Sequence, residues 1–222
     1  TTSPLNPDRS TLLWSRDHSP FPMRRIVKLS EILAHLEQLA PLATAEAWDN
    51  VGLLLGDRQA EVTKIMTCLT LTPDIAVEAV SNGAQLVVTH HPVLFKAVQR
   101  ITTDTVEGRT LWNLARAGIA VYSPHTAWDN APDGINQGLA RLFGLEGVQP
   151  LRPFANMDDP TPAGAGRWGT LPQPMTLADL AHDAARKLAS PRLEFVGDPL
   201  RSITRLGIAC GSAAEFWKDA SR

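Results

Sequence analysis

Three short apolar runs separated by two helical segments constrain the fold of this chain more than any other feature. The runs cover residues 64–71, 85–89 and 119–123. Because apolar side chains dominate each run, they are typical of strands that are buried on both faces of a parallel sheet. The segments between them, 73–82 and 105–117, have helical patterns that end at glycines. The order β-α-β-α-β predicts an α/β fold with three layers, α/β/α, around a mainly parallel or mixed sheet.

Other parts of the chain carry shorter patterns of the same two kinds. They predict helices at 30–40, 134–143 and 176–189 and strands at 193–197 and 203–210. Thr72 followed by Pro73, and Thr176 followed three residues later by Asp179, are typical helix starts. Residues 150–175 contain six prolines, so this stretch is predicted to be an irregular connection.

Composition and charge exclude several classes of protein. The 222 residues allow one large domain or two small ones. Apolar residues make up 44% of the chain and charged residues 20%, which is not the composition of a wholly disordered protein. The net charge of −2 gives no electrostatic case for nucleic-acid binding. No apolar run approaches the roughly 20 residues that span a bilayer, so no membrane partner is expected.

The cysteines and the first 22 residues indicate the expected cellular compartment of the protein. Cys68 and Cys210 match no zinc motif and form no disulfide framework, so a reducing compartment, the cytoplasm, is expected. Residues 1–22 are polar and proline-rich and lack the apolar centre of a secretory signal. We expect this segment to be a disordered extension that precedes a functional start at Met23, with one α/β domain at 23–222.

Histidines and a carboxylate follow two of the predicted strands, at the edge of the sheet where open α/β folds bind ligands. His90 and His91 end one strand, and His125 and Asp129 follow the next. Imidazole and carboxylate bind divalent metals such as zinc, manganese, iron or nickel, which the sequence does not distinguish. The pattern predicts a metal site, and adjacent histidines at a strand end could serve two neighbouring ions suited to hydrolysis.

Less specific interpretations of the same residues remain open. A His-His pair is often a surface feature, and His125 with Asp129 could be an aspartate-oriented histidine at a helix start. Asp49 and Asn50 could be turn residues, since Asx side chains favour turns. Trp48 could wall a pocket, and Lys96 could meet a phosphate or be an ordinary solvated lysine.

Five stretches resemble the Nif-three-like family, whose bacterial members are known as type 2 GTP cyclohydrolase I homologues. They are EAWDNVGL at 46–53, VTHHPVLFK at 88–96, YSPHTAWD at 122–129, GAGRWG at 164–169 and IACGS at 208–212. The resemblance covers about residues 24–220. It implies a three-layer α/β/α fold with two similar, intertwined halves, ring-shaped homohexamers and a dinuclear metal centre.

For this chain, the resemblance implies roles for four residues. His90 and His91 would each bind one of two ions, and Asp129 would bind as well. His125 would lie beside them as a residue that transfers protons. The family's remaining ligands, a His and a Glu, follow a later strand, and nothing after Cys210 matches them. We therefore expect a member without the family's C-terminal segment, with three ligands instead of five and weaker metal binding.

The resemblance also implies an activity. The expected function is that of a metal-dependent hydrolase that opens the ring of a purine nucleotide, GTP. The alternatives are a regulatory or interaction protein that binds metal without catalysis, and a general phosphoesterase. Whether the chain is an enzyme stays open at this point, because the sequence has no P-loop and no guanine-reading motif.

Overall fold

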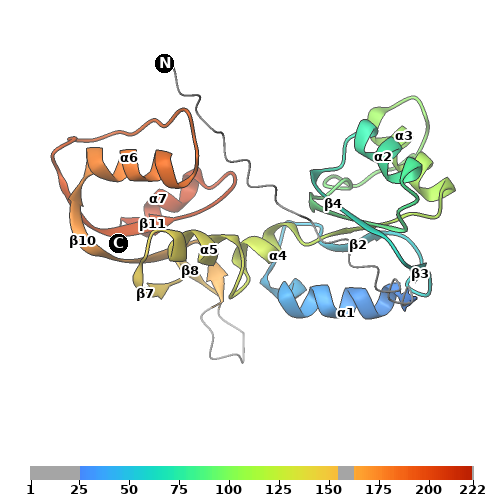
Figure 1. Cartoon of the computed structure of the whole chain (residues 1–222), viewed down its shortest axis with the longest axis horizontal. Coiled ribbons are helices and arrows are strands. Elements are labelled where there is room, and N and C mark those ends of the chain that lie inside the picture. Colours follow the sequence, from blue (N-terminus) through green and yellow to red (C-terminus); the bar gives the residue numbers. More distant parts are fainter. Residues whose placement is uncertain (1–25, 155–162, 222) are drawn as a thin grey trace, which may run out of the picture.

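The computed structural model describes residues 26–154 and 163–221, which form two lobes joined by helix α4 (His125–Asn130) (Figure 1). The extension expected at 1–22 lies outside the described residues. Helix α1 (Leu29–Leu39) and the other described elements before α4 belong to one lobe, and the described elements after α4 belong to the other. Within the described part of the chain, no helix has the length and apolar character needed to cross a membrane.

The first lobe is built on a mixed four-stranded sheet. Its strands are ordered β2 (Gly52–Leu55), β6 (Ala120–Ser123), β5 (Leu86–His91) and β4 (Ile65–Thr70). Strands β4, β5 and β6 are parallel, whereas β2 runs antiparallel to β6. The predicted α/β class with a mixed sheet is confirmed, and the carboxyl ends of the parallel strands share one edge.

Helices cover both faces of this sheet, which makes the lobe a three-layer sandwich (Figure 1). Helices α2 (Pro73–Ser81) and α3 (Val106–Arg116) lie on one face and α1 on the other. Each face has its own apolar core, centred on Val87 and Val121 towards α2 and α3, and on Leu86 and Tyr122 towards α1. Successive side chains of β5 and β6 point to opposite faces of the sheet, and both faces are covered. This is why the two strands appear in the sequence as continuous apolar runs.

The predicted helix starts are confirmed. The Thr72 hydroxyl accepts a hydrogen bond from the backbone N–H of Ile75, and Pro73 occupies the first turn of α2. Likewise, the Thr176 hydroxyl accepts from the N–H of Asp179 at the start of α6 (Leu177–Lys187).

The second lobe contains an antiparallel three-stranded sheet in the order β11 (Ser202–Ile208), β10 (Arg167–Thr176) and β7 (Glu146–Gln149). Helices α5 (Ile135–Leu142) and α6 pack against it around Ala140, Phe143, Leu145, Leu171 and Leu180. The shorter elements of the structure are β1 (Val27–Lys28), β3 (Glu61–Val62), β8 (Arg152–Pro153), β9 (Gly164–Ala165), α7 (Trp217–Ala220) and the single 3-10 turns η1 (Leu42–Thr44) and η2 (Ala214–Phe216).

Three expectations about this architecture were wrong. Strand β10 lies within the stretch predicted to be irregular, because Pro172 and Pro174 fall at a break in register between Thr170 and Met175, where no ladder hydrogen bond is needed. No strand forms at 193–197, whose apolar side chains are exposed. The helical spacing of 105–117 also predicts Trp112 on the core face of α3, but its side chain is 44% exposed.

Candidate metal centre

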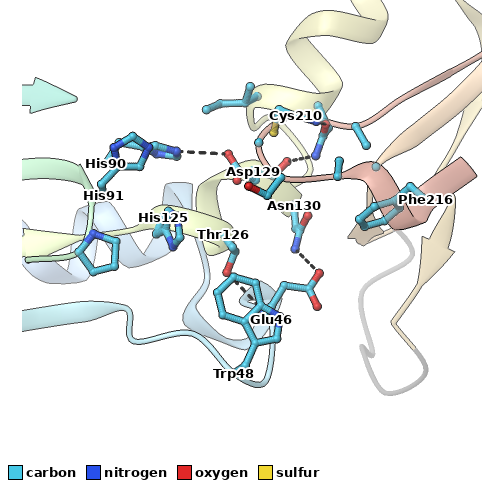
Figure 2. A pocket seen from close by; sticks show the side chains of 18 of the residues that line it. Glu46, Trp48, His90, His91, His125, Thr126, Asp129, Asn130, Cys210 and Phe216 are labelled. Atoms are coloured by element: carbon cyan, nitrogen blue, oxygen red, sulfur yellow. Dashed lines mark hydrogen bonds and ion pairs between the residues drawn. The ribbon is translucent and has the colours of Figure 1, made fainter. Parts of the chain in front are cut away.

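The shared edge of the parallel strands brings the four predicted site residues to one pocket between the lobes (Figure 2). His90 and His91 end β5, while His125 opens α4 directly after β6, with Asp129 one turn later. The cavity has a volume of about 650 Å³, within the usual range for small-molecule sites. The second lobe contributes the facing wall, which includes Cys210 and Phe216.

The three histidines form a cluster of imidazole rings. The ring centroids of His90 and His91 are 5.1 Å apart, those of His90 and His125 5.3 Å, and those of His91 and His125 5.9 Å. Burial lowers the pKa of His90 and outweighs the opposing effect of the Asp129 carboxylate, and the neighbouring imidazoles of His125 and His91 add to the lowering. His90 is therefore held in the neutral form, which is the form that binds metal.

Asp129 turns its carboxylate towards this cluster. Its Oδ1 lies 3.7 Å from Nε2 of His90 and is buried, yet it accepts no hydrogen bond among the described residues. Two ligand atoms of one ion, each about 2.0–2.2 Å from it, are separated by roughly 3–4 Å. The His90–Asp129 spacing therefore falls within the range expected for two ligands of one cation.

Each of the other two imidazoles is oriented by a neighbour through its Nδ1 atom. Nδ1 of His91 is 2.7 Å from the hydroxyl of Thr70 on the adjacent strand β4. Nδ1 of His125 is 2.8 Å from Oδ2 of Asp49, whose side chain is fully buried. A partner on Nδ1 leaves Nε2 of each ring for the pocket, as hydrogen-bond partners of functional histidines generally do.

Asp49 is itself fixed by several donors. Besides His125, its Oδ2 accepts from the hydroxyl of Thr126 at 2.5 Å and from the Thr126 backbone N–H at 3.2 Å. Burial acts to raise the pKa of Asp49, but the hydrogen bonds from Thr126 and His125 outweigh it and place that pKa below the ordinary value. The carboxylate is therefore ionised and suited to hold an imidazolium.

His125 adopts a backbone conformation that side chains rarely take. Its φ is +32°, and apart from Ala189 it is the one described residue other than glycine with positive φ. Such a conformation costs of the order of 1–3 kcal/mol and persists only where surrounding contacts impose it. The bonds from Asp49 to His125 and to Thr126 are such contacts, and strain of this kind is concentrated at functional sites.

Hydrogen bonds from the second lobe fix the backbone around Asp129. Arg167 is 1% exposed, and its guanidinium donates to the carbonyls of Asn130 and Ala131, each at 3.2 Å. It also donates to the carbonyls of Gly164 and Gly166 and to the side chain of Gln137. Buried Arg167 thereby ties the end of α4, the helix that joins the lobes, to the second lobe next to the pocket.

Cys210 completes the wall next to Asp129. Its backbone N–H donates to Asn136, whose side-chain amide donates in turn to the carbonyl of Asp129. Burial raises the pKa of the Cys210 thiol to about 12, and the nearby Asp129 carboxylate adds to the increase. Cys210 and Cys68 are both free thiols.

Whether these residues suit a metal ion depends on donor chemistry and on spacing. No group of three or more His, Cys, Asp or Glu side chains within residues 26–154 and 163–221 is arranged to hold an ion as it stands. The donor types nevertheless fit divalent cations, and the buried, unpaired Oδ1 of Asp129 is an acceptor that a cation would satisfy.

A sequence profile described as Duf34/NIF3 (NGG1p interacting factor 3) matches residues 27–222. This chain belongs to the NIF3 family. A relative from Clostridium perfringens, named GTP cyclohydrolase 1 type 2 homolog, is 36% identical over 88% of this chain and 74% of its own length. NIF3-like protein 1 of Drosophila melanogaster is 32% identical over 86% of this chain and 65% of its own length.

Solved structures agree with this placement of the NIF3-family chain. A Staphylococcus aureus protein, SA1388, superposes with a TM-score of 0.76 at 28% identity and covers 88% of this chain and 76% of its own. A Bacillus cereus protein related to NIF3 superposes with a TM-score of 0.79 at 19% identity, over 89% and 80% of the two chains, and supports the fold alone.

The sequence predicted four residues of this pocket but not the residues that hold them in position. His90, His91, His125 and Asp129 all line the cavity, and Trp48 lines it as well. Lys96, considered for phosphate binding, is not among the lining residues. Asp49, Thr70 and Arg167 were not predicted, although Asp49 lies in a stretch that carried the family resemblance.

Proposed function

We propose that this chain is a metal-dependent hydrolase that opens the ring of a purine compound, with GTP as the expected substrate. The observation that carries the proposal is the convergence of His90, His91, Asp129 and the Asp49-held His125 on one pocket. Relatives named GTP cyclohydrolase 1 type 2 homolog support the choice of substrate.

In this proposal His90, His91 and Asp129 hold up to two divalent cations. When bound, such cations supply the Lewis acidity that makes a water molecule nucleophilic near neutral pH. Thr70 holds the ring of His91 so that its Nε2 faces the pocket. Asp129 contributes the anionic oxygen, which no described hydrogen bond satisfies.

His125 is proposed as the general base. Its Nδ1–H donates to Asp49, so Nε2 is the basic atom that accepts the proton of the attacking water. The ionised Asp49 stabilises the imidazolium that results and keeps the ring in this tautomer. For guanine, the water would add at C8 of the imidazole ring, and His125 would return the proton as that ring opens.

A second candidate function is a regulatory or interaction protein that binds metal without catalysis. It is favoured by one observation, that no three ligand side chains are already assembled into a coordination sphere in the part of the chain that the structure describes. A general phosphoesterase is a third possibility, which the same assay distinguishes.

The test measures metal content and turnover in parallel. Purified protein would be loaded with Zn²⁺ or Mn²⁺, analysed for bound metal, and assayed with GTP and with bis(p-nitrophenyl) phosphate. We expect loss of the purine absorbance of GTP in the parent and at least a 100-fold lower rate in His125→Ala. His182→Ala is the matched control, because His182 lies exposed on α6 and its ring bonds only to the Ala178 carbonyl.

Each outcome separates the three functions. Metal retention without turnover of either substrate would favour the binding protein, and turnover of the phosphodiester alone would favour the phosphoesterase. Equal rates in the parent and His125→Ala would reject the proposed base. The ring-shaped homohexamer and the cytoplasmic location stay predictions.

A further inference from the structure

Two exposed aromatic rings stand at the mouth of the pocket. Trp48 is 62% exposed and Phe95 51% exposed, although both line the cavity. Their ring centroids are 5.9 Å apart at an interplanar angle of 71°. Both rings also lie against His125, with centroids at 6.3 Å and 6.2 Å. Exposed aromatic pairs of this kind, beside a polar cavity, are typical of ligand-binding surfaces.

The loops that carry these two rings are tied to each other. Asn50, two residues after Trp48, donates its side-chain amide to the carbonyl of Leu94, directly before Phe95, at 2.7 Å. The Asn50 backbone N–H donates to Asp49, which in turn holds His125. The aromatic pair is thus part of the same hydrogen-bonded framework as the proposed base, and a ligand would not have to order it.

The charges around the cavity do not suit recognition of a triphosphate by basic side chains. The lining includes the carboxylates Glu46, Asp129 and Glu215, and no Lys or Arg occurs among its described residues. Arg152, the nearby cation on β8, pairs with Glu215 at 2.7 Å and with Asp219 at 2.7 Å. Recognition of a triphosphate normally uses Arg or Lys, which these described walls do not supply.

The polar groups of the cavity instead suit a neutral ring with N–H donors. Among the described residues, the carboxylate of Glu46 receives one long hydrogen bond, 3.4 Å from the Asn130 amide, and a carboxylate has about four acceptor positions. Figure 2 shows Glu46 and Trp48 on the same side of the pocket, with Phe216 across from the imidazoles. A planar heterocycle stacked on Trp48 could donate its ring N–H groups to Glu46.

We propose that this pocket binds an uncharged planar heterocycle of the purine type, stacked on the face of Trp48 with the Phe95 ring against its edge, and that the described side chains give a phosphate tail no recognition of its own. This inference rests on the proposed function and adds which part of the substrate the pocket recognises, because ring opening requires the nucleobase, not the phosphates, at the metal site. The stacking and charge arguments depend on the pocket alone.

The test compares ligands that share a ring and differ in charge. Guanosine, GTP and inorganic triphosphate would be titrated against the whole chain by calorimetry, with and without Mn²⁺. Without metal, we expect guanosine and GTP to bind within about threefold of each other and inorganic triphosphate not to bind. Base–aromatic stacking is worth about 1–3 kcal/mol, so Trp48→Ala should weaken guanosine binding about 5- to 150-fold. Trp48→Phe, which keeps a stacking face, should weaken it less.

A matched control and the contrary results complete the experiment. Trp112→Ala removes an exposed tryptophan from α3, outside the cavity, and should leave guanosine binding unchanged. Binding of GTP at least 100-fold tighter than guanosine without metal would overturn the inference, as would equal guanosine affinity in the parent and Trp48→Ala. Guanosine binding without turnover of GTP would retain the inference and reject the hydrolase, whereas GTP turnover with no guanosine binding would do the reverse.

Discussion

Oδ2 of Asp49 lies 2.8 Å from Nδ1 of His125, although 76 positions separate the two residues along the chain. The pair connects the loop before β2 to the start of α4 and aims Nε2 of His125 at the cavity. The Asp49 side chain is fully buried and also bound by Thr126, so it is held in place. Its hydrogen bond to His125 then fixes the orientation of the imidazole. This relationship is the basis of two predictions.

Asp49→Asn should lower the rate of any hydrolysis by at least tenfold, while metal content stays unchanged. The amide keeps the size of the side chain but removes the charge that stabilises imidazolium, and it permits the wrong tautomer of His125. Steady-state rates at several pH values, with metal analysis of the same samples, check this. Unchanged rates across the pH range would mean that Asp49 is only a structural residue of the loop.

Asp49 should also make stability depend on pH at the acidic end. Its pKa in the folded protein lies below the ordinary 3.8, so folding favours the ionised carboxylate. The stabilisation is fully present above that ordinary value and is lost as the pH falls through the lower, folded pKa. Urea unfolding of the parent and Asp49→Asn should therefore differ at pH 6, and the difference should shrink as the pH falls below 3.8. A difference that grows on acidification would contradict the assigned direction.

The positions of the site histidines could be predicted because strand ends in a parallel sheet meet at one edge. His90, His91 and His125 follow from that rule alone, and the helix from His125 brings Asp129 into reach. The position of Asp49 could not be predicted, because it depends on the antiparallel pairing of β2 with β6. That register places Gly52 opposite Ser123 and thereby brings Asp49 beside His125. No local pattern encodes such a pairing.

The second lobe was harder to predict for a related reason. Strand β10 has prolines in its second half and pairs with β7 only through Trp168 and Thr170. Its local sequence therefore indicates a loop, and the strand forms because β11 supplies partners along most of its length. Burial of Arg167 likewise depends on carbonyls from two separate segments, 130–131 and 164–166, which the sequence does not place together.

Asp129→Asn should reduce bound metal while leaving the fold intact. Oδ1 of Asp129 is buried without a hydrogen-bond donor among the described residues, so loss of its charge removes a cation ligand and little native stabilisation. We expect metal content to fall at least twofold and the free energy of unfolding to change by less than about 1 kcal/mol. Elemental analysis and urea unfolding measure the two quantities, and an unchanged metal content would exclude Asp129 as a ligand.

Thr70→Val should weaken metal binding about 10- to 100-fold, as is typical when the partner of a ligating imidazole is removed. The hydroxyl of Thr70 lies 2.7 Å from Nδ1 of His91, and valine keeps its shape without that bond. Competition with a chelator gives the affinity. Thr103→Val is a suitable control, because Thr103 lies in an exposed loop outside the cavity. Equal chelator sensitivity in the parent and Thr70→Val would show that His91 needs no such support.

Arg167→Met should destabilise the protein by at least about 2 kcal/mol, because a buried carbonyl that is left without a donor costs about 1–3 kcal/mol. The substitution leaves the carbonyls of Asn130, Ala131, Gly164 and Gly166 without their shared donor. Arg167→Lys, with one compact ammonium in place of five fixed donors, should recover only part of the loss. Arg116→Met, at an exposed position on α3, should change stability by less than about 0.5 kcal/mol.

The same substitution tests how the second lobe affects the metal site. Because Arg167 holds the two carbonyls that directly follow Asp129, its loss should let α4 shift and reduce metal affinity even under conditions where the chain remains folded. Chelator competition at low temperature, on samples with native circular dichroism, separates the two effects. Full metal affinity in folded Arg167→Met would restrict Arg167 to stability, and α4 would then hold Asp129 in place without help from the second lobe.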